Sequence, residues 1–500
     1  DDVGSKSTAI GAQALLTQNY STATDSHNTA VGYHSGLYLT TGLRNTLIGS
    51  QAGDALTDAD ENTAVGTLAL STDTLGSRNT AIGRSALQSQ NFTTATNSNN
   101  TAVGFDAATA VTTGINNTII GALAGDALTD ADNNVAIGVT ALTTDTKGNK
   151  NTAVGHSALE AQNFTTSTNS YNTAIGSDSG KAITTGVQNT ILGSSAGDSL
   201  TDADSNIAIG YSALTADTLG SQSVAIGHSA LGTQNFTTAT NSNNTAVGFY
   251  AGLSITTGVN NTFVGANCGD ATDDGAKNVG VGAFALSNNC GDSNTAIGYY
   301  AGVSATGDNN TIVGNQAGEA LSSGSNNLLC GLDAGKTGSP GGNLTNDNNK
   351  IVLGDENIAE AHIQVDWTVA SDQRDKTDFT ALDLGLDFVK ALAPVTYKWD
   401  KRSKYGDKNA EGYDLNAQTP DGTHKEDWLD IGFKAQEVQA LEEAAGYKAA
   451  DKKNLTVSTT SDGKQLGLQY SKFVPILVKA IQEQNALIEA LTARVTALEG

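Results

Sequence analysis

The polar run S-D-Q-R-D-K at residues 371–376 holds the residue types that could do chemistry. A serine hydroxyl is a nucleophile at neutral pH only when a base takes its proton, and a lysine can be that base when burial or a neighbouring cation lowers its pKa. Arg374 is the candidate cation for Lys376. The same run also fits a structural interpretation, in which Ser371 caps the following segment and Lys376 pairs with Asp372 or Asp375 at the surface. The residues alone leave both interpretations open.

Acidic loops of the type D-A-L-T-D-A-D are a second candidate site, because they recur along the chain. Clustered carboxylate oxygens on a turn are ligands that Ca²⁺ prefers, so weak Ca²⁺ binding is one interpretation. The loops lack the glycine and the terminal glutamate of an EF-hand. The alternative to a metal site is an acidic surface whose carboxylates are solvated. No other cofactor is expected. The carboxylates are those of Asp54, Asp58, Asp60, Asp126, Asp130, Asp132, Asp198, Asp202 and Asp204.

Aromatic residues recur in the Q-N-(F/Y)-(T/S)-T loops at 72-residue intervals and form a row along one edge of the predicted fold. Rings on such an edge can stack on sugars, which makes the row a candidate for receptor contact. They can also staple a loop onto a neighbouring coil or chain, which is the more frequent use of such rings and the interpretation we favour. The row consists of Tyr20, Phe92, Phe164 and Phe236.

The element that must position these loops is a repeat whose core is N-T-A-(V/I)-G. Twenty closing glycines run from Gly11 to Gly354, with steps of 21, 17, 17 and 17 residues that sum to a 72-residue period. One short β-prone run per 16 to 17 residues suits one coil of a parallel β-solenoid, or β-roll. Residues 1–355 are therefore predicted to form an all-β solenoid stalk of about twenty rungs, with a length on the order of 95 Å.

Alternation within the pentapeptide predicts how each coil is built. Asn suits a corner, Thr and Val/Ile favour an extended backbone, and Gly accepts the next corner. Thr152 and Val154 should face one side and Ala153 the other, with an interior of Ala, Val, Ile and Leu. Such a thin core leaves one side of the coil exposed, so a single chain buries little apolar surface. We therefore expect the chain to gain stability by forming a homotrimer.

Charge and composition exclude several classes of function. A net charge of −25 argues against nucleic acid and against anionic membrane surfaces, and no run of 18 apolar residues exists to insert into a membrane. A glycan-degrading enzyme needs a carboxylate pair in a cleft, whereas the regular rungs offer no unique pair. We expect no enzymatic activity of the stalk. The chain begins at Asp1 and contains no Met, so a processed or truncated product without its original start is expected.

After residue 355 the repeat stops, and a second kind of domain is predicted. Residues 356–370 are interpreted as a connecting strand, residues 371–470 as a small α+β domain and residues 471–500 as a helix of a parallel three-stranded coiled coil. Gln484 interrupts the apolar heptad seam at one d position. Within the domain we expect helices at 382–392 and 435–444 and strands at 395–399 and 431–434.

Several ordered motifs in residues 371–500 resemble the intramolecular chaperone peptidase domain that ends many phage tail spikes and tail fibres. They are S-D-x-R-x-K at 371–376, L-G-L at 384–386, P-V-x-Y-x-W at 394–399, G-F-x-A-Q-E-V at 432–438 and the terminal helix. The rungs are similar only in architecture to the β-roll of trimeric adhesin heads. The resemblance implies that Ser371 is the nucleophile and Lys376 its base, supported by Asp372 and Arg374. The implied reaction is one self-cleavage per chain, between Ala370 and Ser371.

Two classes of function follow from this resemblance. The favoured one is a homotrimeric tail-fibre or spike stalk of a virion tail, which attaches to a host-surface glycan or protein and is assembled by the C-terminal chaperone. The alternative is a secreted or cell-surface bacterial trimeric adhesin that carries the same self-cleaving domain. A segment that binds a baseplate would indicate the virus, and a signal peptide or cell-wall anchor would indicate the bacterium.

Overall fold

Each N-T-A-(V/I)-G pentapeptide forms a three-residue β-strand, and successive strands pair in parallel without a shift in register, as in Thr101↔Thr118 and Val103↔Ile120. The computed structural model describes residues 3–364, 367–408, 410, 412–451, 453 and 455–500. The chain divides into two compact units, Asp1–Asn309 and Asn310–Gly500. The predicted parallel β-solenoid, followed by a small domain and a long C-terminal helix, is confirmed.

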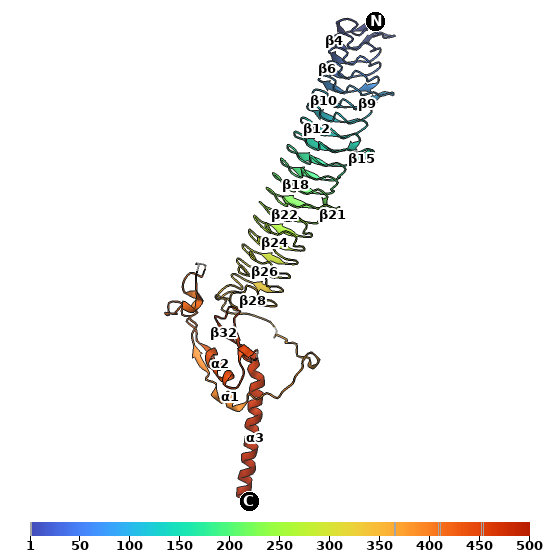
Figure 1. The fold of residues 1–500 in the computed structure, drawn as a ribbon. Helices are drawn as coiled ribbons and strands as arrows, with labels where there is room; N and C mark the ends of the chain where they lie inside the picture. Colours follow the sequence, from blue (N-terminus) through green and yellow to red (C-terminus); the bar gives the residue numbers. More distant parts are fainter. Residues whose placement is uncertain (1–2, 365–366, 409, 411, 452, 454) are drawn as a thin grey trace. The chain divides into compact units, whose positions relative to one another are not determined.

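In the first unit the rung strands follow one another as a single ladder, which Figure 1 shows from β4 to β24. They are β2 (Thr8–Ile10), β4 (Thr29–Val31), β5 (Thr46–Ile48), β6 (Thr63–Val65), β8 (Thr80–Ile82), β10 (Thr101–Val103), β11 (Thr118–Ile120), β12 (Val135–Ile137), β14 (Thr152–Val154), β16 (Thr173–Ile175), β17 (Thr190–Leu192), β18 (Ile207–Ile209), β20 (Val224–Ile226), β22 (Thr245–Val247), β23 (Thr262–Val264), β24 (Val279–Val281) and β25 (Thr295–Ile297).

The longer, 21-residue steps carry an additional pair of two-residue strands beside the ladder. The residues added to these steps extend the coil far enough to make a second parallel pairing at 72-residue intervals. The pairs are β1 (Gly4–Ser5) with β3 (Thr24–Asp25), β7 (Gly76–Ser77) with β9 (Thr96–Asn97), β13 (Gly148–Asn149) with β15 (Thr168–Asn169), and β19 (Gly220–Ser221) with β21 (Thr240–Asn241).

The orientation of the pentapeptide corrects one sequence-based expectation. Ala153 is fully buried, as are the second apolar pair Ala158 and Leu159, whereas Thr152 and Val154 are only half-buried. The Val/Ile position therefore points outward and does not belong to the interior. The buried centre of the strand is Ala in many rungs but Leu47, Ile119 or Phe263 in others, while β-branched residues pack against their equivalents above and below on the outer face.

The asparagine of the pentapeptide also has a different role from the predicted corner. The left-handed backbone belongs to the residue before it, such as Arg44 with φ 59°. Asn45 itself is buried: its backbone N–H donates to Oδ1 of Asn28 at 2.8 Å, and its Nδ2 donates to the Ala59 carbonyl at 2.7 Å. Repeated at most rungs, these bonds form a buried asparagine ladder that satisfies backbone groups at the corner.

The closing glycine is required for two reasons, which Gly176 illustrates. Its φ is +138°, and a Cβ atom at this position would lie 2.5 Å from the Gly193 carbonyl oxygen of the next coil. Any larger residue would therefore strain the backbone and push adjacent coils apart.

The second unit contains the last rungs and the C-terminal domain. A cluster of buried residues around Phe388, Val438, Phe473 and Ile476 forms its core. The described residues of 356–364 and 367–370 include no strand, so the predicted connecting strand is wrong there, and residues 365–366 lie outside the described part. The elements are β26 (Thr311–Val313), β27 (Leu328–Cys330), β28 (Ile351–Leu353), α1 (Leu386–Ala391), β29 (Val395–Tyr397), β30 (Asp430–Gly432), α2 (Ala435–Ala444), β31 (Val457–Thr459), β32 (Leu466–Leu468) and α3 (Phe473–Glu499).

Candidate functional site

A single 3-10 turn, Gln373–Asp375, brings the two candidate catalytic residues of the S-D-Q-R-D-K run, Ser371 and Lys376, together. The Lys376 amine donates to the Ser371 hydroxyl with Nζ and Oγ 2.5 Å apart, and its distance to the Ser371 carbonyl oxygen is 3.4 Å. This separation is within the range required for proton transfer between a nucleophile and its base. The structure therefore joins the pair that the sequence singled out.

The two residues expected to support the pair, Asp372 and Arg374, contact each other in the turn. Asp372, and not Ser371, caps the turn, because its carboxylate accepts from the Arg374 backbone N–H at 2.9 Å. The Arg374 guanidinium also binds this carboxylate, with Nη2 and Oδ2 2.6 Å apart, and holds the pKa of Asp372 below its usual range. Arg374 is thus engaged with Asp372 in the turn, and its effect on Lys376 stays a prediction. Lys376 contacts Ser371 instead of pairing with Asp372 or Asp375.

Burial is the feature that the Ser371–Lys376 pair lacks in a single chain. Ser371 and Lys376 are both exposed to solvent. Burial is one of the conditions that favour a neutral amine, which is the form of lysine that accepts a proton. The contact between Lys376 Nζ and Ser371 Oγ is thus present in one chain, whereas burial of the pair is not.

The acidic loops of the first unit use their carboxylates to join neighbouring coils. Asp60 Oδ1 accepts from the backbone N–H of Leu43 at 2.7 Å, and Asp58 Oδ1 accepts from the Thr41 hydroxyl at 2.5 Å. Equivalent contacts hold Asp132, Asp202 and Asp204, while Asp126 and Asp198 accept from threonines one coil further on. Asp130 lies 4.0 Å from Lys147. Burial raises the pKa of Asp54. Within the described residues no group of three or more His, Cys, Asp or Glu side chains could hold a metal ion. Ca²⁺ binding remains a prediction.

The aromatic row is buried instead of lining an exposed edge. Tyr20, Phe92, Phe164 and Phe236 are between 6% and 7% exposed. The Tyr20 hydroxyl donates to the Gly42 carbonyl at 2.8 Å, which ties the loop to the next coil. In the single chain these rings offer no open face to a receptor, and their burial favours the staple interpretation.

A buried polar network accompanies this row and was missed by the sequence reasoning. Asp145 is fully buried and accepts from three donors: the backbone N–H groups of Gly148 at 3.0 Å and Phe164 at 3.1 Å, and Nε2 of Gln162 at 2.6 Å. Asn172 donates to the other side of the Gln162 amide at 2.8 Å. The same contacts recur around Asp73 and Asp217, so the 72-residue spacing of the D-T-x-G turn was the available signal.

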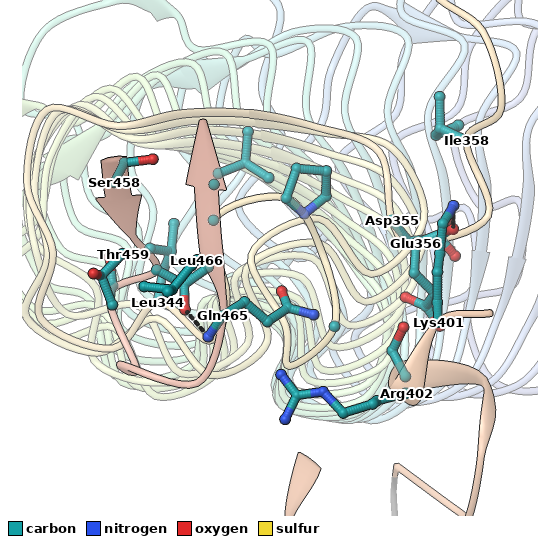
Figure 2. A pocket seen from close by; sticks show the side chains of 18 of the residues that line it. Leu344, Asp355, Glu356, Ile358, Lys401, Arg402, Ser458, Thr459, Gln465 and Leu466 are labelled. Atoms are coloured by element: carbon teal, nitrogen blue, oxygen red, sulfur yellow. Dashed lines mark hydrogen bonds between the residues drawn. The ribbon is translucent and has the colours of Figure 1, made fainter. Parts of the chain in front are cut away.

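A cleft of about 670 Å³ lies in the second unit, and neither Ser371 nor Lys376 lines it. Figure 2 shows Glu356, Lys401 and Arg402 on one side and Ser458 and Thr459 on the other. Beside it, Lys408 Nζ lies 2.8 Å from Asp333 Oδ2 and 3.0 Å from Glu356 Oε1. Burial opposes the charged amine, but these two carboxylates prevail and raise the pKa of Lys408.

Comparison with known proteins bears on the region that begins at the serine. Residues 371–447 match the family model described as chaperone of endosialidase. The matched segment starts at Ser371 and includes Lys376, α1, β29, β30 and α2. Together with the β-solenoid before it, this match is consistent with a tail spike or fibre that carries a C-terminal chaperone. No curated protein and no solved structure matches the chain. Among the described residues, no helix has the length and apolarity to cross a membrane.

Proposed function

We propose that the chain is a homotrimeric tail-fibre or spike stalk for attachment to a host surface. Its C-terminal chaperone domain brings three chains together and then releases itself by cleavage between Ala370 and Ser371. The observation that carries the proposal is the 2.5 Å contact between Lys376 Nζ and Ser371 Oγ, at the first residue of the chaperone match and after the last rung.

The proposed reaction is an acyl transfer followed by hydrolysis. Ser371 Oγ attacks the carbonyl carbon of Ala370 while Lys376 accepts the hydroxyl proton. The C–N bond then breaks, and the leaving nitrogen takes up a proton from Lys376. Water hydrolyses the resulting ester, which leaves a carboxylate on Ala370 and a free amine on Ser371. Each chain undergoes this reaction once.

Cleavage should depend on assembly, because the Ser371–Lys376 pair and one face of the terminal helix α3 are exposed in the single chain. One line of apolar side chains on α3 remains exposed in the single chain at the predicted heptad positions, including Leu477 at 44%, Ile481 at 64% and Leu491 at 63%. An uncovered seam of this kind is buried when helices associate as a coiled coil. Trimerisation through α3 would bring copies of the Ser371 region together, and cleavage would then report that assembly has succeeded.

Fragment masses test the cleavage directly. We expect the purified wild type to give two fragments, residues 1–370 and 371–500, and the variants Ser371→Ala and Lys376→Ala to stay intact. Lys434→Ala is a matched control, because Lys434 is an exposed lysine of the same domain that pairs with Glu437 and not with Ser371. Cleavage of both active-site variants at the wild-type position would contradict the proposal. So would a wild-type trimer that stays uncut.

Attachment is tested with the released stalk. We expect residues 1–370, purified after cleavage, to bind whole host cells as a trimer, whereas the fragment 371–500 should not bind them. Detection of the stalk on particles supports a virion tail, and detection on bacterial cells in the absence of particles supports the adhesin alternative.

A further inference from the structure

The outer face of the solenoid carries two rows of residues that differ from the rest of the surface. They are the first and third residues of each rung strand, and we call them the outward rows. Their exposure differs from that of the buried middle residue, as in β10 and β14. None of the outward-row positions from β2 to β28 is charged, although charged residues make up 16% of the chain.

The row of third residues is apolar at every rung, whereas the row of first residues is mostly threonine. In the first unit Ile48, Ile175, Leu192 and Ile297 are between 38% and 44% exposed. Single exposed aliphatic residues are common on protein surfaces, but a row that repeats at every coil forms one contiguous patch. A patch of this kind usually marks an interaction surface.

The corner that precedes the asparagine of a rung is polar, and in several rungs it is charged. Arg44, Glu61 and Arg78 occupy this corner in successive coils and pair with one another at 3.0 and 3.1 Å. The sequence therefore tolerates charge two positions before the strand and excludes it from the strand face. A polar rim around an uncharged, apolar centre is the composition of a protein–protein interface.

A second copy of the chain is the partner that fits this surface. The outward rows advance by one strand spacing per coil, so only a partner with the same repeat can meet every rung along the ladder. Copies with a net charge of −25 repel one another wherever their charges meet, and the outward rows are the face that avoids this. For the rungs of the first unit a strip about 80 Å long and about 10 Å wide corresponds to about 800 Å² per chain, the size of a standard interface.

We infer that the outward rows are the surface on which the three chains pack in parallel, rung against rung, around a common axis. This inference rests on the proposed trimer and adds the face by which the stalks meet. It also gives the removable C-terminal domain a defined task, because rows that look alike at each coil could pair out of register by one or more rungs.

The natural thiol of Cys330 tests the inference in the second unit. Cys330 is the third residue of β27, exposed and free, whereas Cys268 and Cys290 are buried. We expect a short bismaleimide to link wild-type chains through Cys330 and Cys330→Ser to abolish the link. A matched control moves the thiol to the exposed corner as Asn326→Cys in the Cys330→Ser chain, which should link far less. A trimer that links at residue 326 and not at 330 overturns the inference while leaving the trimeric fibre intact. A monomeric chain overturns both.

Insertion of charged residues into the outward rows tests the inference in the first unit. We expect Ile175→Glu with Leu192→Glu in one chain to lower the unfolding midpoint of the solenoid by about 10 °C or more, because like charges would meet in the trimer. The control, Gln188→Glu with Ser205→Glu, adds the same charge at the exposed corner, where Glu61 shows that glutamate is tolerated. Equal midpoints for the two variants, in a chain that sedimentation equilibrium shows to be a trimer, would overturn the inference.

Discussion

Asp145 shows at the residue scale what the repeat pattern did and did not predict. The 72-residue period was visible in the sequence, and the Q-N-F loops were correctly recognised as periodic. The sequence did not reveal that the aspartate one coil earlier is buried and receives the Gln162 amide and the Phe164 backbone N–H. Side chains one coil apart in space are 17 to 21 residues apart in sequence, and periodicity alone does not state which of them face inward.

Removal of the Asp145 carboxylate should destabilise the local coils. Asp145→Ala leaves the donors of Gly148, Gln162 and Phe164 buried without an acceptor, so we expect the free energy of unfolding to fall by about 2 kcal/mol or more at neutral pH. Urea unfolding measures the loss, and amide hydrogen exchange at residues 148 and 164 localises it. The exposed Asp130→Ala is the matched control. Equal stability of the two variants would contradict a structural role for the network.

The difference in unfolding free energy between wild type and Asp145→Ala should change with pH in one direction. Burial raises the pKa of Asp145 above 3.8, even though its hydrogen bonds from Gln162 and Phe164 act in the opposite direction. An acid whose pKa is raised by folding stabilises the native state most when protonated, and this contribution is lost as pH rises through the folded-state pKa. The stability difference between wild type and Asp145→Ala should therefore shrink as pH rises above 3.8. A difference that grows with pH would contradict the assignment.

At the scale of elements, strong periodicity was the reliable signal. The rungs and α2 (Ala435–Ala444) are found where the pattern predicts them, whereas α1 is shorter than the predicted helix. The hairpin of β31 and β32 was missed, although Asp462-Gly463 between the strands is a hairpin turn signal. Three-residue strands with few apolar positions give too little alternation to be recognised alone. The alternation in the rungs likewise predicted that Thr and Val/Ile lie on one face of the strand and Ala on the other. It did not predict which of these faces is buried.

The 3-10 turn that joins Ser371 to Lys376 should control the cleavage rate. Asp372→Ala removes both the cap of the turn and the partner of Arg374, so Lys376 should be held less well against Ser371. We expect cleavage to slow by about tenfold to a hundredfold, because small displacements of a base are costly to catalysis. The half-time of fragment appearance measures the effect. Asp372→Asn, which keeps a capping acceptor, should be intermediate. A wild-type rate for Asp372→Ala would show that the turn is held by other contacts.

For the whole molecule, the proposed cleavage would turn a contact within one chain into a contact between two fragments. Asp333 and Glu356 stay with the stalk, while Lys408 leaves with residues 371–500. Their mostly buried ion pairs should retain the cut domain. Lys408→Gln should weaken retention by about tenfold or more, because it removes the lysine that joins both carboxylates to the domain and leaves Asp333 with Lys336, a residue of the stalk fragment. Co-elution of the fragments after cleavage measures retention. Lys404→Gln, which removes only a contact with Glu426 inside the same fragment, should leave retention unchanged. Equal retention by the two variants would mean that the ion cluster does not hold the domain on the stalk.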